Sequence, residues 1–428
     1  MERARAFVIV VDACGVGALP DAAAYGDEGT NTLAHVAEAV GGLELPALQA
    51  LGLGCILPLR GVPAVSDPAI FGRLHPLGPG KDSATGHWEL MGAVLQQPLP
   101  TYPDGFPPEV IARLEAATGC AAICNEPYNG IAAIEDFGAE HLRTGALILY
   151  TSQDSVLQIA AHVERVPLQE LYEACAAARE AMRGEHAVGR VIARPFTGTD
   201  GAFERTPGRR DFALPPPGRT YLDELMDAGV PVHGVGKVED LFAGAGIAYS
   251  HAGSSNALAL ASADELLATL DRGLVFVNLI ETDQLYGHRK DVHGFAQALR
   301  ELDEHVARWL VQLRERDLLI VTADHGVDPS HAGTDHTREY APLLAVTGEM
   351  LARGYGGGGM GPAGGLASHG EMPARGRGVA VAGGSAGDTG REGADLRHDG
   401  PLADVGATVL RWLADRDARS LPGESFIS

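Results

Sequence analysis

The chain has 428 residues, 45% of them hydrophobic, and a formal net charge of −23 at pH 7. This length exceeds what one ordinary hydrophobic core serves, so we expect two domains or one large domain with an insertion. The acidic charge repels nucleic-acid phosphates and anionic membrane surfaces, which argues against nucleic acid and membrane as partners. Five scattered cysteines form no paired zinc pattern, and we find neither a signal peptide nor an apolar span of ~20 residues. These features predict a cytoplasmic protein.

Three apolar segments each lead into an aspartate. Residues 7–11 end at Asp12, residues 274–280 run toward Asp283, and residues 318–322 run toward Asp324. Continuous apolar runs of this length are typical of strands that are buried on both faces. Between the last two runs, residues 293–317 carry apolar side chains at helical spacing. The pattern predicts an α/β fold, a mostly parallel sheet flanked by helices, with ligands bound beyond the carboxyl ends of its strands.

The middle of the chain is expected to form a second, smaller α/β domain inserted into the first. We place this cap domain at residues 96–218, because Pro215-Pro-Pro-Gly218 is a plausible boundary. The core domain then consists of residues 1–95 and 219–428. Within it, residues 354–400 hold 17 of the 56 glycines and few large apolar side chains, which predicts a flexible surface insertion.

Six side chains form the central group of candidate metal ligands. Carboxylate oxygens and imidazole nitrogens, with no thiolate, suit Mn(II), Zn(II) or Fe(II) better than Ca(II). Six ligands exceed what one site with an open position uses, so two ions fit better than one. Three aspartates and two divalent ions leave a positive charge that suits a phosphate ester. The six residues are Asp12, Asp283, His288, Asp324, His325 and His336.

A second group of polar residues lies in the segment Gly80-Lys-Asp-Ser-Ala-Thr-Gly-His-Trp-Glu89. A hydroxyl here, activated by a metal ion, could attack phosphorus. Ser83 and Thr85 are equal candidates from their chemistry alone. The alternative is that Asp82, Ser83 or Thr85 caps a helix that begins here, and both roles can coexist because a helix N-terminus favours a phosphate.

The chain resembles the bacterial phosphopentomutase family of the alkaline phosphatase superfamily. The Lys-Asp-x-x-Thr-Gly-His-Trp-Glu motif that begins at Lys81 is specific to that family, whereas Asp324-His325-Gly326 is shared across the superfamily. The resemblance extends from Phe7 to about Leu344 and resumes near the C-terminus. Other matching segments are residues 15–22, 25–33, 151–162 and 189–196.

The resemblance implies an alkaline-phosphatase-like core with two Mn(II) ions and an inserted cap. It implies that Asp283, His288 and His336 hold one ion, and that Asp12, Asp324 and His325 hold the other. It selects Thr85 rather than Ser83 as the hydroxyl that is phosphorylated. In the substrate site it implies Asp154 for the ribose, Arg194 and Arg209 for the distal phosphate, with Arg210 an alternative to Arg209, and Lys237 from the core.

The function that the resemblance implies is a phosphopentomutase. Such an enzyme interconverts ribose 1-phosphate and ribose 5-phosphate, and the 2-deoxyribose pair, through a phosphothreonine and a 1,5-bisphosphate. Glucose 1,6-bisphosphate or a similar bisphosphate is the expected activator, and a small sugar phosphate is the expected partner. The alternatives are a metal-dependent phosphatase or cofactor-independent phosphoglycerate mutase on the same core, and a metal-binding protein without catalysis. The sequence leaves the oligomeric state open.

Overall fold

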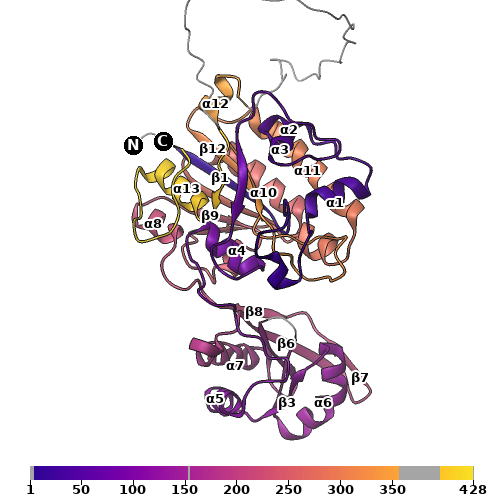
Figure 1. Cartoon of the computed structure of the whole chain (residues 1–428). Coiled ribbons are helices and arrows are strands. Elements are labelled where there is room, and N and C mark those ends of the chain that lie inside the picture. The colour runs from indigo at the N-terminus through magenta and orange to yellow at the C-terminus, as the bar shows by residue number, and fades with distance from the viewer. Residues whose placement is uncertain (1–3, 153–154, 356–395, 428) are drawn as a thin grey trace, which may run out of the picture.

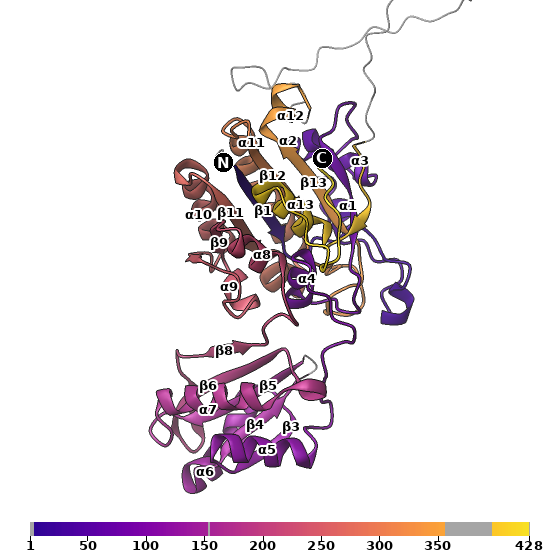
Figure 2. The same cartoon turned by 90° about the vertical axis from the view of Figure 1, so that its left-hand side faces the viewer.

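The computed structural model describes residues 4–152, 155–355 and 396–427, and these contain two separate sheets (Figures 1 and 2). The larger sheet has the strand order β10-β9-β11-β1-β12-β13-β2-β14. Neighbouring strands pair in parallel except at β13, which is antiparallel to both β12 and β2. The strands are β1 Arg5–Val11, β2 Ile70–His75, β9 Val232–Val235, β10 Tyr249–His251, β11 Gly273–Leu279, β12 Asp317–Thr322, β13 Ala341–Thr347 and β14 Gly400–Pro401. The predicted α/β class with a mostly parallel sheet is confirmed.

Helices cover both faces of the larger sheet. On one face α10 and α11 pack against each other, and α11 also contacts α1 and α2; on the other face α13 contacts α8 and α4, and α4 contacts α9. The helices of this part are α1 Thr32–Ala39, α2 Pro46–Leu51, α3 Leu53–Ile56, α4 Ser83–Leu90, α8 Tyr221–Asp227, α9 Val238–Leu241, α10 Asn256–Thr269, α11 Val292–Leu310, α12 Gly348–Ala352 and α13 Asp404–Ala414. The predicted helix over 293–317 is therefore present as α11, but it ends earlier because the Asp317 carboxylate accepts a hydrogen bond from the Arg314 amide at the start of β12.

Burial on both faces explains the apolar composition of the central strands. Every residue of β1, β11 and β12 is buried, whereas β2, near the edge, alternates between buried and half-buried positions. Arg5 is the charged exception in β1, and its guanidinium is paired with the equally buried Asp317 at 2.5 and 2.8 Å. A central strand of a doubly covered sheet has no solvent face, so its sequence shows no alternation.

The smaller sheet is built from the middle of the chain. Its order is β3-β4-β5-β6-β7, with β8 also paired to β6, and α6 covers one face while α5 and α7 cover the other. Its elements are α5 Pro108–Thr118, β3 Ala122–Pro127, α6 Gly130–Thr144, β4 Leu147–Thr151, β5 Val156–His162, α7 Leu168–Ala181, β6 Arg190–Thr199, β7 Ala202–Arg205 and β8 Arg210–Ala213. The two connecting segments meet where the Tyr221 amide donates to the Met91 carbonyl at 2.8 Å. The boundaries of the cap domain at 96 and 218 stay a prediction.

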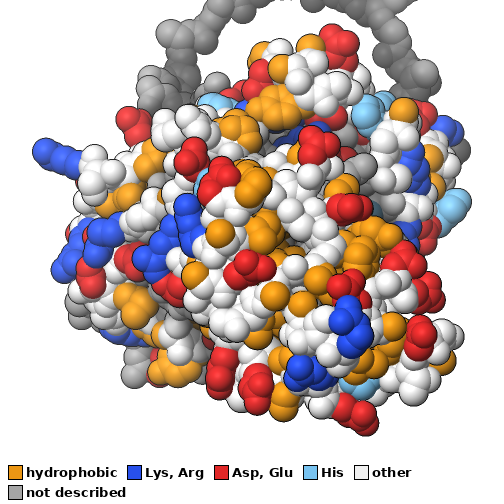
Figure 3. All heavy atoms as spheres, turned by 90° about the horizontal axis from the view of Figure 1, so that it is seen from below, with side chains coloured by type: hydrophobic (Ala, Val, Ile, Leu, Met, Phe, Trp, Pro, Cys, Tyr) orange, Lys and Arg blue, Asp and Glu red, His pale blue; other side chains and the backbone are white. Residues whose placement is uncertain are grey.

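The glycine-rich segment lies mostly outside the described residues, which resume at Leu396. The described residues 396–400 are ordered against β2, since Phe71 donates to the Leu396 carbonyl at 3.0 Å and accepts from His398 at 2.8 Å. None of the described helices combines the length and the apolar character that crossing a membrane requires. Viewed from below, the surface carries acidic and basic side chains intermixed with hydrophobic ones (Figure 3).

Candidate active site

The three predicted aspartates lie together at the carboxyl ends of three adjacent strands. Asp12 follows β1, Asp324 follows β12, and Asp283 lies in a π-helical turn, Thr282–Gly287, shortly after β11. Because β11, β1 and β12 are neighbours and parallel, their carboxyl ends share one edge of the sheet. All three side chains are buried, with 0 to 5% of their surface exposed.

Local backbone pairing places the histidines beside these aspartates. Gly326 and Thr337 form an antiparallel bridge, with a hydrogen bond of 2.7 Å from the Thr337 amide to the Gly326 carbonyl. The bridge sets the neighbouring residues His325 and His336 side by side, with ring centroids 4.3 Å apart. His288 follows the π-helical turn, and its Nδ1 lies 2.6 Å from the Thr334 carbonyl oxygen. All six predicted ligands therefore converge, although they come from three separate parts of the sequence, near residues 12, 283–288 and 324–336.

The ligand atoms form two overlapping groups. In the first, Asp283 Oδ1 lies 3.3 Å from His288 Nε2 and 3.5 Å from His336 Nε2, which is the predicted set for one ion. In the second, His325 Nε2 lies 3.2 Å from Asp12 Oδ1 and 3.5 Å from Asp324 Oδ2. Asp12, Asp283 and His325 also offer ligand atoms that all lie within 4.8 Å of one another. Asp283 therefore lies between the two groups.

Proximity of buried charges shifts the protonation of these groups. Burial and the charge of Asp324 raise the pKa of Asp12 above its ordinary value. Burial alone would raise the pKa of Asp283 as well, but the imidazoles of His288 and His336 hold it below its ordinary value. The contact with Asp283 in turn raises the pKa of His288 to about 9. The cluster thus attracts positive charge.

The donor set fits divalent metal ions. Asp283 Oδ1 and Asp324 Oδ2 are buried and make no hydrogen bond of normal geometry within the described part of the chain. A buried carboxylate oxygen without a donor is costly unless a cation satisfies it. Three carboxylates and three imidazoles, all pointing at one small volume, are ligands that Mn(II), Zn(II) and Fe(II) accept.

The segment of the two candidate hydroxyls begins α4, and Asp82 is its N-cap. The Asp82 carboxylate accepts hydrogen bonds from the amides of Ala84 and Thr85 at 3.0 and 3.1 Å, so the capping alternative holds for Asp82. Thr85 is part of the same capping box: its hydroxyl donates to Asp82 Oδ2 at 2.8 Å, and its side chain lies against Gly80. This hydroxyl is turned back toward the start of the helix.

Ser83 is the hydroxyl that contacts the ligand cluster. Its Oγ lies 3.1 Å from Asp12 Oδ1 and 3.1 Å from His325 Nε2. Residues two positions apart in a helix point in directions about 200° apart, and in this structure the hydroxyls of Ser83 and Thr85 contact different groups. The choice of Thr85 that the family resemblance implied stays a prediction.

The predicted substrate residues lie on the smaller sheet and at the start of α9. Arg194 of β6 is half-buried and donates from Nε to Gln158 Oε1 at 3.0 Å. Arg209 is exposed and makes two 2.8 Å hydrogen bonds to Asp211. Burial and the charge of Arg209 lower the pKa of Arg194, and burial lowers the pKa of Lys237, which also experiences the charges of Asp211 and Arg209. Arg209 therefore influences both Arg194 and Lys237. Asp154 lies outside the described residues.

Two buried polar residues that contact the candidate ligands were not predicted from the sequence. Asn278 Nδ2 donates to Asp12 Oδ2 at 2.7 Å, and His87 Nδ1 lies 3.0 Å from Asp324 Oδ2. The signal in the sequence was Asn278 itself, the one amide in the apolar run 274–280. A polar residue in such a strand needs a hydrogen-bond partner, and here the partner is a candidate ligand.

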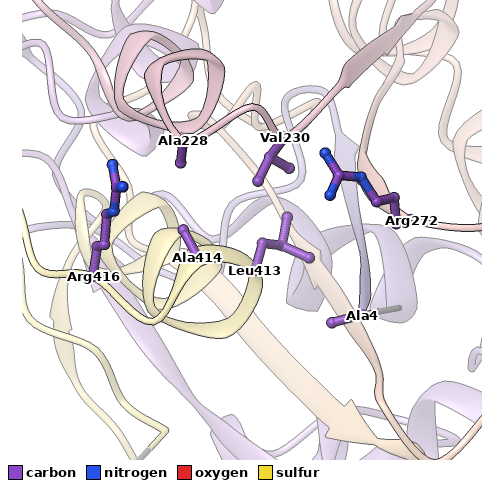
Figure 4. Close-up of a pocket in the computed structure, with 8 residues that line it drawn as sticks. Ala4, Ala228, Val230, Arg272, Leu413, Ala414 and Arg416 are labelled. Carbon is purple, nitrogen blue, oxygen red and sulfur yellow. The ribbon is translucent and has the colours of Figure 1, made fainter. Parts of the chain in front are cut away.

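A small pocket elsewhere in the molecule has no relation to these residues. Ala4, Ala228, Val230, Arg272, Leu413, Ala414 and Arg416 line it (Figure 4). Ala4 immediately precedes β1, so this pocket lies at the opposite edge of the sheet from Asp12. None of the candidate site residues contributes to it.

Comparison with known proteins identifies the family. The model of the metalloenzyme superfamily matches residues 4–414. A phosphopentomutase from Caldanaerobacter subterraneus subsp. tengcongensis is 50% identical over 347 residues, which cover 81% of this chain and 88% of that protein. One from Anaeromyxobacter dehalogenans is 50% identical over 359 residues, covering 83% and 91% respectively.

Solved structures are more distant. The phosphoglycerate mutase of Leishmania mexicana is 14% identical, with a TM-score of 0.45 and coverage of 99% of this chain and 98% of its own, a likeness too remote to bear on activity. The sequence identity to the curated relatives extends over most of both chains, and the family model spans nearly all of this one. The chain therefore belongs to the phosphopentomutase family of enzymes, within the metalloenzyme superfamily.

Proposed function

We propose that the protein interconverts the 1-phosphates and 5-phosphates of ribose and 2-deoxyribose through a phosphoenzyme and a 1,5-bisphosphate. The observation that carries this proposal is the start of α4, which bears the hydroxyls of Ser83 and Thr85 and lies against a buried cluster of carboxylates and imidazoles. We infer a pentose phosphate as the substrate because the curated relatives are named phosphopentomutases. A small sugar phosphate is then the partner of this site.

The ligand cluster is proposed to hold two divalent ions, which we take to be Mn(II). Asp283, His288 and His336 would hold one, and Asp12, Asp324 and His325 the other. When bound, such ions neutralise charge on a transferring phosphoryl group and lower the pKa of a neighbouring hydroxyl. Asp283 would be within reach of either ion, because its carboxylate belongs to both groups.

The phosphoryl group is proposed to pass between the enzyme and the two ends of the sugar. The free sugar hydroxyl attacks the phosphoenzyme, an O–P bond to the sugar forms as the bond to the enzyme hydroxyl breaks, and a 1,5-bisphosphate results. The other phosphoryl group then moves to the same enzyme oxygen. The proton that the first sugar oxygen loses is replaced by one taken up at the second, so the cycle balances. A bisphosphate such as glucose 1,6-bisphosphate would supply the first phosphoryl group.

The substrate is proposed to be held from the smaller sheet. Arg194 and Arg209 are suited to the phosphate that is not being transferred, because a guanidinium binds phosphate through two hydrogen bonds. Lys237 would add charge from the core, and Asp154 would bind the sugar hydroxyls. Arg209 would have to share its contact with Asp211.

The reaction is tested with protein loaded with Mn(II), ribose 1-phosphate and a trace of glucose 1,6-bisphosphate. We expect ribose 5-phosphate to accumulate without release of inorganic phosphate. Release of inorganic phosphate without ribose 5-phosphate would identify a phosphatase instead. Exchange on 3-phosphoglycerate but not on ribose 1-phosphate would identify a phosphoglycerate mutase.

The phosphorylated residue is tested by intact mass after incubation with glucose 1,6-bisphosphate. The chain belongs to the family whose motif has threonine at position 85, so we propose Thr85 as the phosphorylated residue; Ser83, whose Oγ contacts the ligand cluster, is the alternative. We expect Thr85→Val to lose the phosphate adduct and Ser83→Ala to retain it. An adduct on Thr85→Val that is absent from Ser83→Ala would identify Ser83 as the nucleophile.

A further inference from the structure

A chain of buried polar groups runs behind the candidate ligands. Asn278, within β11, donates from Nδ2 to Asp12 Oδ2 at 2.7 Å, and the same nitrogen lies 3.3 Å from His87 Nε2. On its other side, His87 Nδ1 lies 2.8 Å from the Ser83 carbonyl oxygen and 3.0 Å from Asp324 Oδ2. Both Asn278 and His87 are 0% exposed. These buried groups therefore connect the candidate ligands Asp12 and Asp324 with the backbone of Ser83.

The partners define which atoms of His87 carry hydrogen. An amide nitrogen is a donor only, so the Nε2 that faces Asn278 acts as an acceptor. The hydrogen of the neutral ring then resides on Nδ1 and is donated to the Ser83 carbonyl at 2.8 Å, while Asp324 Oδ2 lies 3.0 Å from the same nitrogen. This arrangement satisfies the contacts with Asn278 and Ser83, and it places a positive partial charge beside Asp324.

Asn278 contacts the outer oxygen of the Asp12 carboxylate, and His87 lies beside the Asp324 oxygen that also faces His325. Asp12 uses Oδ2 for Asn278, while its Oδ1 faces Ser83 and His325. Asp324 accepts hydrogen bonds at Oδ1 from the amides of Ala13 and His325, both at 3.1 Å, and His87 approaches Oδ2. Groups that hydrogen-bond ligating side chains from outside orient them, and their loss weakens metal affinity about 10–100-fold in known sites.

We propose that His87, supported by Asn278, is a positioning residue that holds Asp12, Asp324 and the Ser83 turn in fixed relation. The inference rests on the proposed function only in taking the cluster to be the metal site. His87 itself is not placed among the ligands, because its two ring nitrogens already face Asn278, Ser83 and Asp324. Its role is to keep the Asp12 and Asp324 carboxylates at a fixed separation.

Two polar substitutions of His87 distinguish a positioning role from a general effect on packing. In His87→Asn the side-chain amide nitrogen falls near the position of Nδ1, whereas in His87→Gln the amide group falls near Nε2. We expect His87→Asn to bind Mn(II) within about threefold of the unchanged protein. His87→Gln should bind it about 10–100-fold more weakly, the range known for outer partners of metal ligands. Calorimetric titration of the metal-free protein with MnCl₂ gives both affinity and stoichiometry.

A variant at Asn278 provides a second test in case the His87 variants do not fold. Asn278→Leu suits an apolar strand and removes the donor to Asp12, so we expect it to fold and to bind Mn(II) at least tenfold more weakly. Circular dichroism in the presence of a chelator confirms folding of each variant before titration. Unchanged Mn(II) binding by a folded Asn278→Leu or His87→Gln variant, or equal losses in His87→Asn and His87→Gln, would overturn the proposal.

The titration is independent of the substrate. If ribose 1-phosphate is not converted by the unchanged protein while the His87 variants differ as expected, the proposed function fails and the positioning role stands. If ribose 1-phosphate is converted and the variants bind Mn(II) alike, the positioning role fails and the proposed function stands.

Discussion

Gly86 is the residue at which α4 meets the turn that carries Asp324. A Cβ atom at this position would lie 2.5 Å from the Asp324 carbonyl oxygen and 2.8 Å from the Asp324 Cβ. Real Cβ atoms do not approach other atoms so closely, and backbone cannot move aside as a flexible side chain can. The absence of a side chain at Gly86 thus lets the helix start lie directly on the candidate site, with Ser83 and His87 on either side.

We predict that Gly86→Ala destabilises the protein. Alanine is favoured over glycine within a helix by about 1 kcal/mol, but overpacking against a fixed backbone costs roughly 1–3 kcal/mol. The net effect should be a loss of stability in urea unfolding, together with weaker Mn(II) binding because Asp324 shifts. Ala84→Gly, two residues away, is the control; it should lose stability through helix propensity alone and leave Mn(II) binding unchanged. A Gly86→Ala variant as stable as the unchanged protein would show that the backbone relaxes.

At the scale of elements, His141 connects α6 to the smaller sheet through two hydrogen-bond contacts. Its Nδ1 lies 2.6 Å from the Ala146 carbonyl oxygen, and its Nε2 accepts a hydrogen bond from the His162 amide at 2.9 Å. The ring is 0% exposed, and burial lowers its pKa below the ordinary value. Protonation would remove the acceptor that His162 uses, so the folded state needs the neutral ring.

This contact makes stability dependent on pH in a defined direction. The pKa of His141 is lowered by folding, so the unfolded chain takes up the proton more readily, and the stabilisation is present above about pH 6.5 and lost as pH falls below it. The loss is at most about 1.4 kcal/mol per pH unit for one proton. Urea unfolding at pH 7.5 and 5.5, with chelator present, should show a larger loss in the unchanged protein than in His141→Gln. Equal losses in both proteins would contradict the assignment.

At the scale of the whole molecule, the direction of β13 separates the glycine-rich segment from the candidate site. Because β13 runs opposite to its neighbours, its end and α12 lie at the end of the sheet away from the carboxyl ends that carry the aspartates (Figure 2). The chain returns at Leu396, whose carbonyl accepts from Phe71 near the start of β2, at that same end of the sheet. Both flanks of residues 356–395 are therefore remote from Asp12 and Ser83.

We predict that replacing residues 356–395 with a Gly-Ser linker of about ten residues leaves the activity within about twofold, since both described flanks of the replaced segment lie far from the candidate site. The measurement is kcat/KM for ribose 1-phosphate, with the thermal unfolding midpoint as the control for folding. A folded deletion variant with tenfold lower kcat/KM would show that the segment acts on the site.

The sequence by itself determined the strands and the six candidate ligands. Residues 7–11, 274–280 and 318–322 are apolar without interruption because a doubly covered sheet leaves them no solvent face, and that pattern is local. The aspartates that follow such runs converge wherever the strands are parallel neighbours, so Asp12, Asp283 and Asp324 could be grouped without coordinates. The three histidines joined the group because imidazole nitrogens and carboxylate oxygens suit the same divalent ions. The family resemblance then divided the six residues between two ions and implied an alkaline-phosphatase-like core.

Only the tertiary structure decided which side chains face one another. The rotation of α4 turns Ser83 toward Asp12 and turns Thr85 back into the cap, a difference of two residues that spacing could not resolve. The strand order sets Asn278 beside Asp12 and His87 beside Asp324, across separations of 266 and 237 residues in sequence. Such contacts depend on the angle at which a helix meets a sheet, and packing of the whole molecule fixes that angle, whereas a local pattern of residues does not.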